Sequence, residues 1–259
     1  DTNIIIGITD TGIDIDHQDL IYNIAYNTDD PLDGIDNDND GFTDNFRGWD
    51  VGDNDNNPQC DNNQNHGTYV SGLAAPSTDN GIGISGAGFK CRILPVKISD
   101  YDGILTHAYE GIVYAADHGC DVINCAWGST VYHPYGQDII NYATFNCDAL
   151  VVASAGNENN TLSFYPASFE NTLSVAATTI NDEKWTPENT GTSSGSSYGY
   201  HIDLSAPGTM MYTTDEGGYR TVYGGTSFSG PVVAGCAGIV KAMNPEYSAL
   251  QLGEVLKNS

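Results

Sequence analysis

Short runs of aliphatic and β-branched residues alternate along the chain with stretches of helical periodicity. The aliphatic runs predict buried strands at residues 4–9, 92–96, 121–125, 150–153 and 173–177. Apolar positions three or four residues apart predict helices at 106–118 and 138–145, a third after Ser227 and a fourth after its N-cap residue, Ser248. Because alternating strands and helices form right-handed crossovers, we expect an α/β fold with a doubly wound, mostly parallel sheet flanked by helices. Functional groups are expected at the carboxyl ends of its strands.

Two polar segments interrupt this pattern. Residues 29–65 are crowded with Asp and Asn, and residues 185–200 are rich in Ser, Thr and Gly. Loops of this length inside a compact domain are usually functional or are held by something other than a hydrophobic core. A chain of 259 residues can form one α/β domain. We therefore expect a single domain over residues 1–259, with an acidic, calcium-binding insertion at about 29–65.

The chain carries 34 acidic and 8 basic side chains, which give a formal net charge of −26. Nucleic acids and anionic membranes are polyanions, so this charge disfavours both as partners. The sequence also lacks the roughly 18 consecutive apolar residues of a membrane-spanning helix. We expect a monomer that binds neither nucleic acid nor membrane, although many of these carboxylates could serve solubility alone.

Six cysteines occur without any Cys-x-x-Cys pair, which argues against zinc ligation and thioredoxin-like chemistry. We expect disulfides formed in an oxidising compartment, with Cys60–Cys91 and Cys120–Cys147 as trial pairs. Cys125 and Cys236 lie in apolar sequence and are equally compatible with buried free thiols. Since disulfides of this kind form outside the cytosol, we expect a secreted protein. The chain opens with Asp1 and enters a strand at once, so we expect that a signal peptide and an intramolecular pro-segment are absent from this sequence.

Three short motifs carry the residue types of a nucleophilic hydrolase. Asp10 ends a predicted strand within residues 8–14, His66 opens a helix within residues 65–72, and Ser227 precedes an apolar helix within residues 225–231. A serine hydroxyl is a weak nucleophile near neutral pH, so an imidazole must accept its proton and a carboxylate must orient that imidazole. Each residue alone could be a cap or a structural group. Their joint occurrence favours a catalytic triad.

The three motifs, in this order, resemble the subtilisin-like serine protease family, and the resemblance extends from residue 4 to about residue 257. It implies a serine endopeptidase that hydrolyses peptide bonds in protein or peptide substrates through an acyl-enzyme intermediate. It also implies that the side-chain amide of Asn157 and the backbone N–H of Ser227 stabilise the oxyanion.

Two other functions stay open. The same triad could pass the acyl group to a peptide amine, which would make the protein a processing protease, transpeptidase or macrocyclase, and a chain with these motifs could be a catalytically silent binding module. Residues 191–195 also fit the G-x-S-x-G motif of esterases and lipases, with Ser193 as the nucleophile. No Asp or Glu separates Ser193 from His201, so the required order of serine, acid and histidine is absent and we expect a loop.

In the family the substrate adds as a strand beside two enzyme segments, which match residues 124–129 and 153–157 here. We expect Trp127 to line or narrow a subsite, with packing in the core as the alternative. Glu158 either faces the first specificity pocket, where it would favour Lys or Arg, or is a solvated loop acid. The expected substrate-binding residues are Cys125, Ala126, Trp127, Gly128, Ala155, Gly156 and Glu158.

Residues 36–44 carry oxygen-bearing groups at the spacing of a calcium loop, with Gly41 at the sharp turn. Arg47 occupies the position of the bidentate glutamate of an EF-hand, so we expect a lone calcium loop, with a solvated acidic turn as the alternative. The expected ligands are Asp36, Asp38, Asp40, Asp44 and the carbonyl of Phe42. The family resemblance implies a second site formed by Asp19, the Asn80 side chain and the carbonyls of Thr78, Ile82 and Ile84. We therefore expect one or two structural Ca²⁺ ions.

Overall fold

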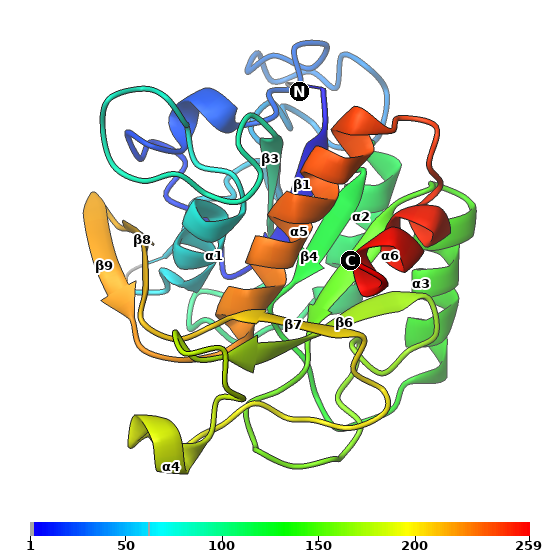
Figure 1. Ribbon diagram of the computed structural model, residues 1–259. Coiled ribbons are helices and arrows are strands. Elements are labelled where there is room, and N and C mark those ends of the chain that lie inside the picture. Colours follow the sequence, from blue (N-terminus) through cyan, green and yellow to red (C-terminus); the bar gives the residue numbers. More distant parts are fainter. Residues whose placement is uncertain (1–2, 62) are drawn as a thin grey trace.

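The computed structural model describes residues 3–61 and 63–259, and its main element is a seven-stranded parallel sheet in the order β2-β3-β1-β4-β5-β6-β7 (Figure 1). The strands of this sheet are β1 (Ile5–Asp10), β2 (Trp49–Asp50), β3 (Arg92–Lys97), β4 (Val122–Cys125), β5 (Leu150–Ser154), β6 (Thr172–Thr178) and β7 (Leu204–Pro207). A separate antiparallel hairpin pairs β8 (Met211–Asp215) with β9 (Gly218–Val222).

Helices cover both faces of the sheet (Figure 1). One face carries α1 (His66–Ala74), α5 (Thr226–Met243) and α6 (Ala249–Lys257), and the other carries α2 (Ala108–Asp117) and α3 (Pro134–Phe145). Two short elements, η1 (Ile21–Asn23) and α4 (Pro187–Thr190), lie in connecting segments. The expected doubly wound α/β fold is confirmed.

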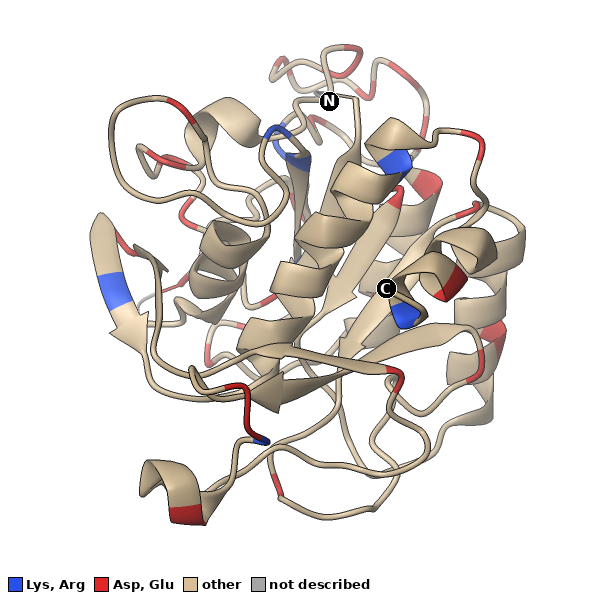
Figure 2. Ribbon diagram, in the orientation of Figure 1, with Lys and Arg blue, Asp and Glu red and all other residues tan. Residues whose placement is uncertain are grey.

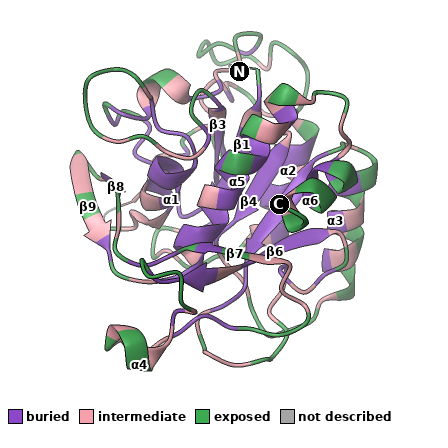
Figure 3. Cartoon of the chain, in the orientation of Figure 1, coloured by how far each residue is buried: buried purple, intermediate pink, exposed green. Residues whose placement is uncertain are grey.

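The core consists of two layers, one on each side of the sheet, which appear as the buried centre of Figure 3. Ile6 and Ile8 of β1 face α5, where Val233 is buried, whereas Val96 of β3 belongs to the layer formed with α2. Because both faces are covered, the strands read as nearly continuous apolar runs. At Gly7 the sheet and α2 approach so closely that a Cβ would lie 2.9 Å from that of Ala115.

The strand order reverses at β1, since β3 and β2 lie on one side of it and β4 to β7 on the other. In open α/β sheets the crevice at such a reversal, beyond the carboxyl ends of the strands, is the usual place for a site. All five predicted strands are present, with ends displaced by at most one residue. Asp10 is the last residue of β1 and therefore lies at the position in the fold where a functional site is expected.

The disulfide prediction is wrong for this structure, in which all six cysteines are free. Cys120 is buried with its Sγ against Gly7, Cys91 is buried with its Sγ against Gly238, and neither is bonded to its expected partner, Cys147 or Cys60. Cys125 is buried as a free thiol, whereas Cys236 is exposed on α5. Among the described residues, no helix combines the length and the apolar character needed to cross a membrane.

Candidate active site

The carboxylate of Asp10 lies at the end of β1, where only 2% of the residue is exposed. Its Oδ1 accepts hydrogen bonds from the backbone N–H of Thr11 (2.8 Å) and from Nδ1 of His66 (2.8 Å), the first residue of α1. A proton on Nδ1 leaves Nε2 of the neutral ring free to act as a base. Burial lowers the pKa of His66, but the charge of Asp10 and its hydrogen bond outweigh burial, so the pKa is raised from its ordinary value.

Contacts at the start of α1 hold this helix against the loop after β1. The hydroxyl of Thr11 donates to the carbonyl of Gln64 (2.7 Å) and accepts from the backbone N–H of Gly67 (3.3 Å). Gly67 permits the close approach, because a Cβ there would lie 2.2 Å from the carbonyl oxygen of Gly12. A larger residue at position 67 would push α1, and His66 with it, away from β1.

Ser227 is the second residue of α5, so its backbone N–H lies at the positive end of the helix dipole. Its hydroxyl donates to the carbonyl of Ala126, the residue after β4 (3.0 Å). The next residue, Phe228, has its ring centroid 6.0 Å from that of His66, so the first turns of α5 and α1 are neighbours. Among the described residues, this hydroxyl bonds to Ala126 and not to the imidazole of His66; hydrogen bonds between catalytic groups often form only when substrate is bound.

Asn157 lies in the turn after β5, and its carboxamide is held in one orientation. Oδ1 accepts hydrogen bonds from the backbone N–H and the hydroxyl of Thr226, both at 2.9 Å. The amide nitrogen is therefore left to donate to a substrate oxygen. Gly156 has a φ of +100°, and a Cβ there would lie 2.8 Å from the Glu158 carboxylate, so this turn requires glycine. Thr226 was not predicted as a functional residue; its position directly before Ser227 is the only sequence signal for it.

The two segments expected to bind substrate follow neighbouring strands, since β4 pairs with β5. Cys125 is fully buried and its Sγ accepts a hydrogen bond from the hydroxyl of Thr9 (3.6 Å), so only its main chain can face a substrate. The indole N–H of Trp127 also donates to Thr9 (3.0 Å), and its ring meets Tyr109 edge-on at 5.6 Å. Trp127 and Gly128 line a pocket of about 260 Å³. Trp127 thus packs on the core and lines a pocket at once.

Three other residues expected to bind substrate, Ala155, Gly156 and Glu158, lie with Asn157 in the turn after β5. Glu158 is exposed, and its Oε2 accepts from the backbone N–H of Asn157 (2.9 Å) and from the hydroxyl of Ser197 (3.4 Å). These bonds hold the carboxylate against the main chain of Asn157. Ala126 and Ala155 are buried, with 5% and 0% of each residue exposed, so their main-chain groups are what they can offer.

Three carboxylates of the insertion form a cluster. Asp30, Asp36 and Asp38 have oxygen atoms that all lie within 4.8 Å of one another, a separation that suits ligands bound to one calcium ion at about 2.3–2.6 Å. Asp30 is fully buried, and Oδ1 of Asp36 is buried without a hydrogen-bond partner in the described chain. A hydrogen bond from Asn27 lowers the pKa of Asp38. An unpaired buried oxygen among three carboxylates fits a cation. Asp30 was missed because it precedes the recognisable spacing at 36–44.

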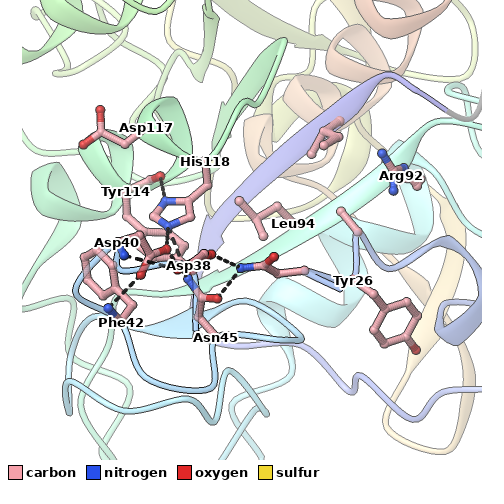
Figure 4. Close-up of a pocket in the computed structure, with 13 residues that line it drawn as sticks. Tyr26, Asp38, Asp40, Phe42, Asn45, Arg92, Leu94, Tyr114, Asp117 and His118 are labelled. Carbon is pink, nitrogen blue, oxygen red and sulfur yellow. Dashed lines mark hydrogen bonds and ion pairs between the residues drawn. The ribbon is translucent and has the colours of Figure 1, made fainter. Parts of the chain in front are cut away.

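The other expected ligands of this loop have different partners. Oδ2 of Asp40 accepts from Nε2 of His118 (2.9 Å) and from Nδ2 of Asn45 (2.8 Å), which ties the loop to the end of α2 (Figure 4). Oδ1 of Asp44 accepts from two backbone N–H groups of residues 33 and 34, both at 2.8 Å. The ring of Phe42 packs edge-on against His118 at 5.4 Å. Of the four predicted carboxylates, Asp36 and Asp38 thus lie in the cluster, whereas Asp40 and Asp44 do not.

The residues of the second expected calcium site also meet, through hydrogen bonds. Asp19 is fully buried, and its two oxygens accept from Nδ2 of Asn80 (2.8 Å) and from the N–H of Ile84 (2.9 Å). Oδ1 of Asn80 accepts from the N–H of Ile82 (3.1 Å), and the hydroxyl of Thr78 donates to the carbonyls of residues 76 and 89. These hydrogen bonds bring the expected ligand residues together, and a carboxylate oxygen can accept an N–H bond and still bind a cation, so the second site stays a prediction.

Comparisons with known proteins agree in sequence and in fold. The model of the peptidase S8 subtilase family matches residues 1–259. The chain is 37% identical over 248 residues to thermitase of Thermoactinomyces vulgaris, with 95% of this chain and 77% of that protein covered. It is 35% identical to the thermophilic serine proteinase of Bacillus sp. (strain AK1), with 91% of this chain but only 51% of that protein covered. The solved structure of sphericase has a TM-score of 0.79 at 26% identity, covering 99% of this chain and 83% of that one. The chain therefore belongs to the subtilase family and is a serine endopeptidase.

Proposed function

We propose that Asp10, His66 and Ser227 are the catalytic triad of this endopeptidase and that Asn157 and the backbone N–H of Ser227 form its oxyanion hole. The observation that carries this proposal is the 2.8 Å hydrogen bond between the buried Asp10 carboxylate and Nδ1 of His66. The bond supports a base with a fixed tautomer, and the ring of His66 lies near Phe228 at the start of α5, directly after Ser227.

The residues would act in sequence. Oγ of Ser227 attacks the scissile carbonyl carbon while Nε2 of His66 accepts the hydroxyl proton. The oxyanion that forms accepts hydrogen bonds from Nδ2 of Asn157 and the N–H of Ser227, in a site already fixed by Thr226. His66 then gives its proton to the leaving amine as the C–N bond breaks. Water, deprotonated by the same imidazole, hydrolyses the acyl-enzyme and releases Ser227.

Labelling with a serine-directed fluorophosphonate tests the nucleophile. The wild-type chain should gain the mass of one label on the peptide that contains Ser227, and Ser227→Ala should abolish both labelling and peptide hydrolysis. Ser193→Ala is the matched control, because Ser193 is an exposed serine in the G-x-S-x-G sequence and should keep full labelling. Labelling that survives Ser227→Ala would contradict the proposed triad, and a wild-type chain that is neither labelled nor active would indicate a binding module.

The acyl side of a substrate would run along residues 125–128 and 155–157 as an added strand, which supplies affinity through main-chain hydrogen bonds. Trp127 would line one subsite, and Glu158 would favour Lys or Arg at the residue before the scissile bond. Cleavage-site profiling of a peptide library with wild type and Glu158→Gln tests the second assignment. If wild type shows no preference for basic residues, or if Glu158→Gln keeps that preference unchanged, the role assigned to Glu158 is wrong.

We further infer that the cluster of Asp30, Asp36 and Asp38 holds one structural Ca²⁺ ion. Its support is the short separation of the three carboxylates and the unpaired Oδ1 of Asp36. When bound, the ion would neutralise charges that otherwise repel one another within the insertion.

We also infer that the enzyme acts outside the cell. One relative, 33% identical over 198 residues, is the cell wall-associated protease of Bacillus subtilis (strain 168). Immunodetection in the medium and the wall fraction of the source organism tests this, and a signal confined to the cytoplasm would contradict it.

A further inference from the structure

A pocket of about 390 Å³ adjoins the proposed nucleophile on the side of the β8–β9 hairpin. Among the residues that line it are Phe228, which directly follows Ser227, and Tyr69, which lies three residues after His66 in α1. No residue of the segments 124–129 and 153–158 lines it. Because those segments take the acyl side of the substrate in the proposed function, the residues beyond the scissile bond run toward this pocket.

The walls of the pocket are fixed relative to the proposed general base. The hydroxyls of Thr213 and Thr214 in β8 donate to the carbonyls of Tyr69 and Thr68 in α1, both at 2.6 Å. A Cβ at Gly72 would lie 2.2 Å from the hydroxyl of Thr214, so helix and hairpin are in direct contact. A substrate side chain bound here would therefore be held in register with the scissile bond.

Among the described residues that line the pocket, Arg220 alone is charged, and it gives β9 its single basic segment in Figure 2. Its Nη1 donates to the hydroxyl of Tyr69 (2.6 Å), and its guanidinium lies 4.9 Å from the centroid of that ring. Asp215, its ion-pair partner, is 3.8 Å away, beyond hydrogen-bond distance, and 47% of the Arg220 side chain is exposed. Since a guanidinium has five N–H donors, these contacts orient the group and leave donors for a ligand.

The setting of Arg220 suits a carboxylate. Tyr69, Tyr223 and Phe228 give the pocket aromatic walls beside Arg220, with 65% of Tyr223 and 47% of the Arg220 side chain exposed, so an ion pair formed there stays partly solvated. Guanidinium binds a carboxylate through two parallel hydrogen bonds. In a chain with a net charge of −26, most of the surface repels an acidic substrate, so an arginine at this position would locally favour the carboxylate-bearing member of a substrate pair.

We propose that this pocket binds the substrate residues on the C-terminal side of the scissile bond and that Arg220 selects a carboxylate there. The inference rests on the proposed triad, because the triad defines which side of the cleft receives the leaving group. The carboxylate belongs either to an Asp or Glu side chain or to the free C-terminus of the substrate.

Competition between paired peptides tests the selection. All peptides share one acyl-side sequence; three pairs carry Asp or the neutral Asn at the first, second or third position after the scissile bond, with an amidated C-terminus. A fourth pair ends soon after the scissile bond as a free carboxylate or as an amide. The enzymes are wild type, Arg220→Gln, Arg220→Glu and the control Arg47→Gln, whose arginine pairs with Asp16 outside the pocket. Two competing peptides share one enzyme, so the ratio of their kcat/KM values does not depend on how much of a variant is folded.

Wild type should prefer the carboxylate-bearing member of at least one pair by about two- to fivefold, the effect of an exposed ion pair. This preference should weaken as salt rises from about 0.01 M to about 1 M. Arg220→Gln should bring the ratio of the two kcat/KM values to about one, Arg220→Glu should invert this ratio, and Arg47→Gln should retain the wild-type ratio. The peptide pair that shows the preference identifies the carboxylate ligand as a side chain or as the C-terminus. Equal rates for wild type in every pair, or a preference that survives Arg220→Gln, would overturn the assignment. Failure of wild type to cleave any peptide would instead contradict the proposed triad.

Discussion

A carboxamide can stabilise an oxyanion only if its nitrogen, and not its oxygen, faces the substrate. At Asn157 the orientation is decided by Thr226, whose backbone N–H and hydroxyl both donate to Oδ1. The same hydroxyl accepts from the N–H of Gly156 (3.2 Å), and only 1% of Thr226 is exposed. One buried threonine therefore orders the turn after β5 and links it to the start of α5, where Ser227 lies.

The hydrogen bond between Asp10 and His66 predicts a pH dependence. Nε2 must be unprotonated to accept a proton, so kcat/KM should fall as the pH decreases through the pKa of His66, which lies above its ordinary value of 6.5. In Asp10→Asn the charge that raises the pKa is lost while burial, which lowers it, remains. The pKa of His66 should therefore fall below that of wild type, and kcat should fall by about 10⁴-fold because the tautomer is no longer fixed.

The imidazole signals of His66 in an NMR titration give the pKa directly, even where turnover is too slow to measure. Ser227→Ala serves as the background, since it prevents self-digestion during the titration. Asp16→Asn is the control, because Asp16 is an exposed carboxylate paired with Arg47 and should leave the titration unchanged. A His66 pKa that stays the same or rises in Asp10→Asn would contradict the electrostatic role given to Asp10.

At the scale of elements, the sequence predicts those strands and helices whose own residues form a hydrophobic pattern. The five buried strands can be predicted because both faces are covered by helices, so nearly every residue is apolar. The strands β2, β7, β8 and β9 are missed because they are short or polar: β2 has two residues, β7 has four and ends in Pro207, and β9 reads Gly-Tyr-Arg-Thr-Val. Helix α3 begins at Pro134, four residues before the predicted start, because proline at the first helical position looks like a turn in sequence.

The residues of the candidate site likewise include some that the sequence predicts and some that it does not. Asp10, His66 and Ser227 can be found because each stands in a short motif at the end of an element. Asp30 and Thr226 cannot, because Asp30 meets the other two carboxylates only through the folding of the insertion and Thr226 contacts Asn157, which is 69 residues away in the chain. Residues that act through tertiary contacts leave no local pattern.

The capping box of α6 predicts a measurable loss of stability. The hydroxyl of Ser248 accepts from the N–H of Gln251, and Oε1 of Gln251 accepts from the N–H of Ser248. Ser248→Ala should lower the free energy of unfolding by about 1 kcal/mol, whereas Ser248→Gly should cost only a few tenths, since glycine tolerates the cap conformation. Denaturant unfolding in the Ser227→Ala background measures both, with the exposed Ser163→Ala as control. If Ser248→Ala matches Ser163→Ala, the box contributes nothing to stability.

At the scale of the molecule, the few cations neutralise particular carboxylates and leave the rest uncompensated. Lys97 is buried between Asp50 and Asp61, at 2.7 Å from each, and Lys257 lies 3.1 Å from Asp203. Figure 2 shows acidic residues spread over many loops, with basic residues few and scattered. With 34 acids against 8 bases, the folded chain repels itself, and the clustered carboxylates of the insertion repel most strongly.

Two effects of cations must be separated to test the calcium proposal. Any salt screens the overall repulsion, so NaCl should raise the melting temperature of every variant. A bound Ca²⁺ ion acts in addition and saturates: at about 100 times its Kd it should add about 2.7 kcal/mol to the free energy of unfolding. For a chain of this size that corresponds to a rise of several degrees in Tm, which chelation should reverse.

Substitution at Asp36 distinguishes calcium binding at the cluster from general screening by salt, because Oδ1 of Asp36 is the buried oxygen of the cluster that has no hydrogen-bond partner among the described residues. In the Ser227→Ala background, Asp36→Asn should remove the saturable calcium shift and keep the response to NaCl. Asp182→Asn is the matched control: it removes the same charge at an exposed turn and should keep both responses. Asn at position 36 also relieves repulsion, so Asp36→Asn should lose little stability in chelator while losing its gain in calcium. An identical calcium shift in Asp36→Asn and Asp182→Asn would exclude the cluster as the binding site.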